Sequence, residues 1–201
     1  MSLSPSAQIR NHWLQLLGIA AVLAALDQLA KGGVRSLLSP GARLPVLDGI
    51  LQVRYVQNYR GLSWWLPDLP GWFGPVLDIL FLLIVLGVIP VYLFYAGKKR
   101  TSGWARISAI CLTAGALGHL SDGLFAPYTV DFIQFFNWPS ANFADFYSYL
   151  GLGALILECV WLARKGGHHW KGMRPFLATM AQTRREFLQF LIENLRINQQ
   201  D

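Results

Sequence analysis

Residues 72–95 read WFGPVLDILFLLIVLGVIPVYLFY and contain one charged side chain, Asp78. A helix needs about 20 mostly apolar residues to cross the hydrocarbon core of a bilayer. Three further stretches meet that requirement, at about residues 13–31, 105–125 and 143–163. The sequence therefore predicts an all-α integral membrane protein with four transmembrane helices.

The composition favours the same class. Of the 201 residues, 54% are hydrophobic and 14% are charged, whereas about a quarter of the residues in a soluble domain are charged. The net charge of +6 could suggest nucleic acid in a soluble protein. Here the basic residues lie largely between and after the apolar stretches, so we expect them to orient the chain in a bilayer and predict no nucleic-acid partner. Cys111 and Cys159 both fall in apolar stretches without CxxC spacing, which favours buried thiols.

The distribution of Lys and Arg predicts the topology. The connection after residue 95 and the tail after residue 163 are basic, whereas residues 126–142 hold neither Lys nor Arg. We therefore expect both termini to be cytoplasmic and residues 126–142 to lie outside. One connection runs against the rule, because the segment after the first helix carries four arginines, Arg35, Arg43, Arg54 and Arg60.

That arginine-bearing connection, about residues 32–71, is too long for a tight turn. Residues 51–56 alternate apolar and polar side chains, which predicts a strand. Proline and glycine residues interrupt the chain between residues 67 and 74, as is typical of turns and loops. We expect a small extracytoplasmic β-cradle at about residues 42–66, within a four-span domain at residues 1–165.

Residues 166–201 form a separate basic tail. From about residue 175 to 197 apolar residues recur at spacings of three and four, among many charges. This pattern is typical of an amphipathic helix on the cytoplasmic membrane surface. A helix that binds a membrane-protein partner is the alternative.

Two aspartates, Asp131 and Asp145, are the candidate catalytic residues. Each lies where an apolar segment meets water, and an ionisable group at that depth is a functional-site candidate. Asn142 can cap the helix that Asp145 enters, and the helix N-terminus favours a charged Asp145. The apolar neighbours of Asp131 favour its neutral form. One charged and one neutral carboxyl is the arrangement of an aspartic protease dyad.

Other polar residues accompany these apolar segments. Asp27 and Lys31 are four apart and can pair on one helix face, either as an anchor or as a strut for the site. Asn58 ends the strand-like stretch, where it can form a turn or hold a peptide carbonyl. His119 and Asp122 are three apart on the third helix. Because no second His or Cys has ligand spacing, we predict no cofactor and no metal, although His119 raises a haem- or pigment-binding alternative.

The order of these motifs resembles that of lipoprotein signal peptidase, or signal peptidase II, a bacterial membrane aspartic protease. The resemblance spans about residues 26–153. It rests on five motifs in order: Asp27-Gln-Leu-Ala-Lys31, Asn58 with Gly61, Gly115-Ala-Leu-Gly-His-Leu-Ser-Asp122, Tyr128-Thr-Val-Asp131-Phe-Ile133 and Asn142-Phe-Ala-Asp145. It implies that Asp131 and Asp145 form the catalytic dyad. The same resemblance assigns support of the site or substrate to Asp27, Lys31, Asn58, Asp122 and Asn142.

The resemblance also implies the substrate and the location. The substrate is a diacylglyceryl-modified prolipoprotein, cut just before the lipid-modified cysteine at the inner membrane, with membrane lipids around the site. The chain departs from the family pattern at His119, where Asn is usual, and at Gly123, where Arg is usual. We hypothesise that Arg60, displaced by an extra turn residue, replaces the missing arginine. The alternative function is an inactive paralogue that binds a lipid, a lipopeptide or a membrane protein.

Overall fold

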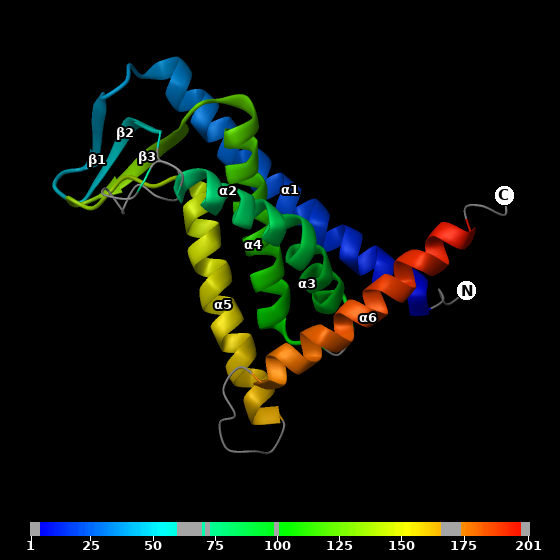
Figure 1. Ribbon diagram of the computed structural model, residues 1–201. Coiled ribbons are helices and arrows are strands. Elements are labelled where there is room, and N and C mark those ends of the chain that lie inside the picture. Colours follow the sequence, from blue (N-terminus) through cyan, green and yellow to red (C-terminus); the bar gives the residue numbers. More distant parts are fainter. Residues whose placement is uncertain (1–4, 60–69, 71–72, 99–100, 166–173, 198–201) are drawn as a thin grey trace.

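The computed structural model describes residues 5–59, 70, 73–98, 101–165 and 174–197. Helices dominate, and a small sheet covers one end of the bundle (Figure 1). In chain order the helical elements are α1 (Pro5–Leu37), α2 (Phe73–Leu83), η2 (Ile84–Val88), α3 (Ile89–Ala96), α4 (Gly103–Phe125), α5 (Phe143–Lys165) and α6 (Arg174–Ile197). The strands are β1 (Arg43–Leu47), β2 (Leu51–Asn58) and β3 (Thr129–Phe135).

Three helices are long and apolar enough to cross a membrane. They cover Asn11–Leu37, Gly103–Phe125 and Phe143–Arg164, within α1, α4 and α5. Each corresponds to one of the stretches predicted from the sequence. Leu86–Ala96 is a shorter apolar helix, and it ends the consecutive elements α2, η2 and α3 at the position of the fourth predicted span.

Proline explains the π-helical turn between α2 and α3. Pro90 has no backbone N–H, and its ring clashes with the carbonyl four residues earlier, which falls inside η2. The chain widens by one residue there, so that the N–H of Ile89 donates to the carbonyl of Ile84. The helical path continues through the proline instead of ending at it.

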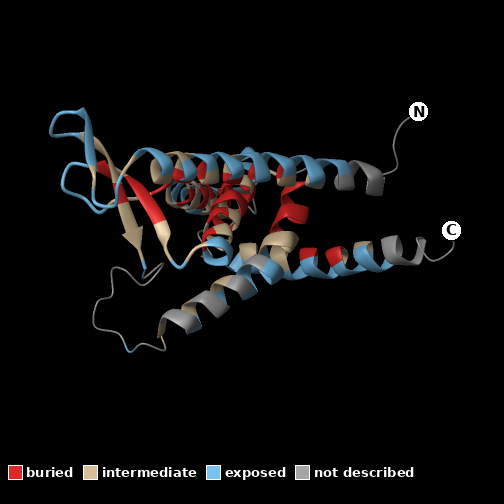
Figure 2. Ribbon diagram, turned by 90° about the horizontal axis from the view of Figure 1, so that it is seen from above, coloured by how far each residue is buried: buried red, intermediate tan, exposed pale blue. Residues whose placement is uncertain are grey.

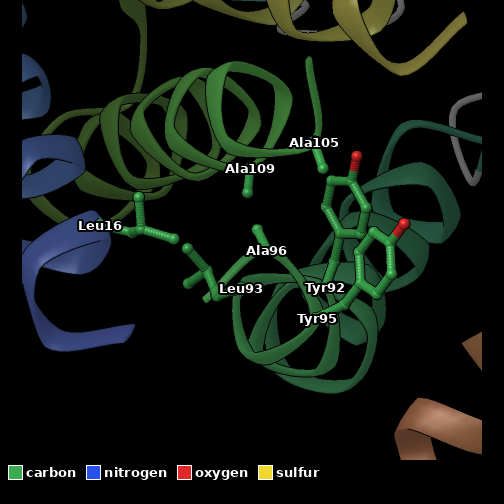
Figure 3. Close-up of a cluster of buried hydrophobic side chains, with 7 residues drawn as sticks. All are labelled: Leu16, Tyr92, Leu93, Tyr95, Ala96, Ala105 and Ala109. Atoms are coloured by element: carbon green, nitrogen blue, oxygen red, sulfur yellow. The ribbon is translucent and has the colours of Figure 1, made fainter. Parts of the chain in front are cut away.

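The bundle core lies where α1, α3 and α4 meet. Figure 3 shows Leu16 of α1 and Leu93 of α3 on the side of Ala109 of α4, while Ala105 of α4 lies beside the tyrosine rings of α3. Small residues on α4 let neighbouring helices approach closely, which is how membrane helices pack. Outside this core many large apolar side chains are exposed, among them Leu14, Val22 and Leu29 of α1, and Figure 2 shows exposed residues along α1.

The sheet is antiparallel, in the order β1-β2-β3. The strand predicted at residues 51–56 lies within β2. β3 was not predicted, because residues 126–142 were interpreted as a loop. Val130 and Phe132 of β3 pack with Tyr55 of β2 against α1 and Phe143, so strand and bundle are joined.

Two arginines that run against the charge rule interact with this sheet region. The guanidinium of Arg35 lies over the ring of Tyr128, 5.9 Å from its centre. Arg54 Nη1 donates to Gln134 Oε1 at 3.0 Å. Local contacts in the sheet, rather than topology, account for these two charges.

Candidate active site

Asp131 lies in β3 opposite a β-bulge. It pairs with Val56 of β2, and the register shifts between Val53 and Val56 because β2 has an extra residue there. A bulge re-aims side chains and is frequent beside active sites. The Asp131 side chain is 7% exposed, although an isolated carboxylate is strongly disfavoured in such burial.

Two amide side chains donate hydrogen bonds to the buried Asp131 carboxyl and so compensate for its loss of contact with water. Asn142 Nδ2 donates to Asp131 Oδ1 at 2.7 Å, and Asn58 Nδ2 donates to Asp131 Oδ2 at 3.1 Å. Asn58 is therefore the last residue of β2, and its side-chain amide binds the Asp131 carboxyl. Each carboxyl oxygen offers two lone-pair positions, so each keeps one for a proton or a water molecule.

Asp145 begins α5 in a capping box. The N–H of Asp145 donates to Asn142 Oδ1 at 3.1 Å, and the N–H of Asn142 donates to Asp145 Oδ2 at 2.9 Å. This reciprocal pair satisfies two backbone donors that a helix start leaves free. It confirms the capping role predicted for Asn142 from its spacing.

Asn142 thereby links the two aspartates. Its amide nitrogen contacts Asp131, while its amide oxygen and backbone N–H contact Asp145. The bond from Asp145 fixes which end of the amide is the oxygen, so the nitrogen must face Asp131. One residue thus sets the positions of both carboxyl groups.

The surroundings raise the pKa of Asp131 to about 7. Burial is the largest cause, followed by the negative charge of Asp145. The amides of Asn142 and Asn58, and the more distant charge of Lys31, act in the opposite direction. The surroundings therefore favour a neutral Asp131 up to about pH 7, the direction expected from its apolar neighbours in the sequence.

His119 lies beside Asp145. His119 Nε2 of α4 is 3.4 Å from Asp145 Oδ1, and the two side chains are 18% and 26% exposed. The ring of Phe81 meets the imidazole edge-on at 6.4 Å between centres. His119 and Asp122 serve different partners although they are three residues apart, because Asp122 faces α1.

A buried ion cluster joins α1 to α4. Lys31 Nζ lies 2.6 Å from Asp27 Oδ2 and 2.6 Å from Asp122 Oδ2. The Asp27–Lys31 pair confirms the spacing argument, and its side chains are fully buried. Gln28, which was not singled out from the sequence, donates to Asp122 Oδ1 at 3.0 Å and to the Gly118 carbonyl at 3.1 Å.

This cluster is linked to the start of α5, where Asp145 lies. The N–H of Ala144, between Asn142 and Asp145 in the chain, donates to Asp27 Oδ1 at 3.1 Å. A side chain at Gly118 would meet Ala144 Cβ at 2.8 Å, and one at Gly115 would meet the Ala144 carbonyl at 2.9 Å. The small residues Gly115 and Gly118 on α4 therefore let the first turn of α5 pack closely.

The remaining predicted site residue, Arg60, lies outside the described residues. Gly123 is exposed, and a Cβ added there meets nothing within 4 Å. In the described part of the chain no group of three His, Cys, Asp or Glu residues is arranged to hold a metal ion.

Comparison with known proteins agrees with this geometry. The family model for signal peptidase (SPase) II matches residues 19–161. The lipoprotein signal peptidase of Fusobacterium nucleatum subsp. nucleatum is 36% identical over 148 residues, which are 72% of this chain and 85% of the relative. That of Halothermothrix orenii is 33% identical over 149 residues, covering 74% and 97% of the two chains.

Solved structures show the same fold. Two bacterial membrane enzymes determined by the in meso method have TM-scores of 0.57 and 0.59 to this chain. They are 22% and 21% identical and cover 71% and 79% of this chain, and 90% and 93% of their own. These findings define a bacterial integral membrane protease. The chain belongs to the signal peptidase II family.

Proposed function

We propose that this chain removes the signal peptide from diacylglyceryl-modified prolipoproteins, with Asp131 and Asp145 activating one water molecule. The observation that carries the proposal is the link through Asn142, which holds both carboxyl groups at one junction of strand and helix. The relatives are named lipoprotein signal peptidase, which supports a lipoprotein substrate; the diacylglyceryl modification follows from the family resemblance.

The proton positions assign the roles. In the proposed cycle Asp131 is the acid, because its pKa is raised to about 7 and the carboxyl keeps its proton below that pH, and Asp145, in the first turn of α5, is the base. Water attacks the scissile carbonyl carbon while Asp145 takes its proton and Asp131 protonates the carbonyl oxygen. The diol then collapses: its hydroxyl returns a proton to Asp131, Asp145 protonates the amide nitrogen, and the carbon–nitrogen bond breaks.

The surface beside Asp145 suits a lipid-modified substrate. Phe146 and Tyr149 follow Asp145 in the first turns of α5 and are 36% and 65% exposed. Phe135 of β3 packs edge-on to Phe146, with ring centres 6.2 Å apart. We expect the acyl chains of the substrate to lie on this apolar surface and to enter laterally from the bilayer.

The consecutive elements α2, η2 and α3 are proposed as the fourth span. With four spans both termini lie on one side, and the lysines and arginines after α3 and α5 favour the cytoplasm for that side. The sheet and dyad then lie outside, where a translocated lipoprotein is found. Accessibility of single cysteines to an impermeant thiol reagent, at Tyr59 and near residue 101, tests this orientation.

The decisive experiment is cleavage of a diacylglyceryl-modified prolipoprotein by the purified full chain. We expect release of the signal peptide by the wild type and its loss in Asp131→Asn and Asp145→Asn. Gln52→Ala is the matched control, because Gln52 lies in the same sheet and its amide bonds Gln134. Cleavage that survived Asp145→Asn would refute the dyad.

His119 is proposed as a positioning residue for Asp145. Its Nε2 lies 3.4 Å from Asp145 Oδ1, so the imidazole can hold the carboxyl group in position. His119→Ala should lower kcat, whereas His119→Asn, which keeps a side-chain N–H donor and is the residue usual in the family, should restore it. An unchanged kcat in His119→Ala would argue against this role.

The hypothesis about Arg60 can be tested by mutation. We expect Arg60→Ala to lose cleavage nearly as completely as Asp131→Asn. Because position 123 has open space for a side chain, Gly123→Arg should restore activity to Arg60→Ala. Wild-type cleavage by Arg60→Ala would contradict the hypothesis.

A further inference from the structure

The helix α6 lies outside the segment that matches the signal peptidase II family, which ends at residue 161. One face of α6 holds it against the bundle. Phe187 packs on Trp13 of α1 and on Phe94 of α3, with ring centres 6.4 and 5.4 Å apart. Lys98 Nζ lies 2.5 Å from Glu186 Oε2, so α6 is fixed across the end of the bundle opposite the sheet (Figure 1).

A second face of α6 combines apolar and positively charged residues. Leu177, Leu188 and Ile192 are 56%, 47% and 49% exposed. Residues seven apart lie on one helix face, which places Arg184 with Leu177 and Arg185 with Ile192. Exposed leucine and isoleucine side by side with exposed arginine is a pattern suited neither to a packed core nor to a solvated surface.

A third face is polar and uncharged at its exposed positions. Gln182 and Gln189 are exposed, and they are seven residues apart, so they form one strip. Three faces with different partners, namely the bundle, a mixed apolar and basic surface, and water, are typical of a helix in the membrane interface.

We propose that α6 lies in the headgroup region of the bilayer and binds anionic phospholipids. Leu177, Leu188 and Ile192 would enter the acyl boundary, while Arg184 and Arg185 bind lipid phosphates. Charge complementarity favours this occupant over a protein partner, because anionic leaflets attract basic helices. The neighbouring surface of α1 favours lipid too. Phe187 packs on Trp13 of this spanning helix, and the next residue, Leu14, is exposed.

Spin labels on the full chain in nanodiscs of phosphatidylcholine and phosphatidylglycerol test the placement. Labels replace Leu177, Leu188 and Ile192, with Gln182 and Gln189 as matched controls, in a chain whose native cysteines, Cys111 and Cys159, are changed to Ala. We expect oxygen to relax the first three labels more than a water-soluble nickel complex does, and the reverse for the controls. Equal access of the nickel complex to all five labels would overturn the proposal, and so would shielding of the leucine labels from both reagents, which indicates a protein partner.

The lipid charge is tested by titrating the detergent-solubilised full chain with fluorescent phosphatidylglycerol. One arginine near an anionic surface strengthens association about fivefold, so Arg184→Gln/Arg185→Gln should bind on the order of 25-fold more weakly. Gln182→Ala/Gln189→Ala should bind like the wild type. Unchanged binding by the arginine variant would overturn the assignment. Neither measurement depends on cleavage, so failure here leaves the proposed protease activity untouched.

Discussion

Replacing Asn58 by Ala should change the pH dependence of cleavage in a direction set by one hydrogen bond. Asn58 Nδ2 donates to Asp131 Oδ2 at 3.1 Å, and this bond lowers the pKa of Asp131. A hydrogen bond to a charged group contributes about 1.5–3 kcal/mol, and about 1.4 kcal/mol corresponds to one pKa unit. Since Asp131 keeps the amide of Asn142, we expect a rise of about one unit.

The consequence appears on the alkaline side of the profile. If neutral Asp131 is the acid, kcat/KM falls once pH exceeds its pKa, which is about 7 in the wild type. At pH 8 about a tenth of wild-type molecules would keep the proton, and about half of the Asn58→Ala molecules. The variant should have a lower maximum but a fall that begins about one pH unit later.

The assay is kcat/KM for release of the signal peptide from a diacylglyceryl-modified prolipoprotein in micelles, measured from mildly acidic to alkaline pH. Gln52→Ala is the control, because Gln52 bonds Gln134 further along the same pair of strands. Its profile should match the wild type. If kcat/KM of Asn58→Ala fell on the alkaline side at the same pH as the wild type, or at a lower pH, the assignment of Asp131 as the acid would be refuted.

Three further changes should act on stability, measured by thermal unfolding in detergent. Lys31→Met leaves two carboxylates without their shared cation, which typically destabilises by about 3–5 kcal/mol, whereas Lys31→Arg should lose less; equal melting of Lys31→Met and wild type would contradict the cluster. Gly118→Ala forces a contact with Ala144 Cβ and should destabilise by about 1–3 kcal/mol, while Gly123→Ala, which meets nothing, should not. The Glu158 carboxyl is fully buried and accepts hydrogen bonds from the hydroxyls of Tyr95, at 2.5 Å, and Ser102. Glu158→Ala should therefore destabilise the fold by about 1–3 kcal/mol for each hydroxyl left without its partner. Glu158→Gln should recover part of that stability.

Local sequence patterns predicted much of this structure. The spanning helices follow from the length of apolar runs, because the bilayer sets that length. The cap formed by Asn142 and Asp145, and the pair of Asp27 with Lys31, follow from spacings of three and four residues on a helix. Each of these features joins residues that the helix itself brings together.

Contacts between distant segments could not be predicted in the same way. β3 is a strand because β2 lies beside it, although the bonded residues Asn58 and Asp131 are 73 positions apart in the chain. The contact of His119 with Asp145 and that of Lys31 with Asp122 depend on how α4 packs against α5 and α1. Spacing alone did not indicate one site: Asp131 and Asp145 were paired by their place at the membrane edge, and the resemblance to a family added Asn58, Lys31 and Asp122.

The placement of one aspartate on a strand and the other on a helix has a pharmacological consequence. Phe132 of β3 packs edge-on to Phe143 of α5 at 5.2 Å, and this contact forms a seam between the two supports. A displacement of a catalytic group by about 1 Å can lower a rate about a hundredfold. A small molecule inserted between Phe132 and Phe143 would therefore inhibit cleavage without binding either carboxylate. Phe143→Ala removes one ring of this contact and should lower kcat in the cleavage assay with both aspartates intact. An unchanged kcat would show that the contact does not hold the aspartates in position. Resistance to such an inhibitor would then arise at the two phenylalanines, where substitution is tolerated more easily than at a catalytic acid.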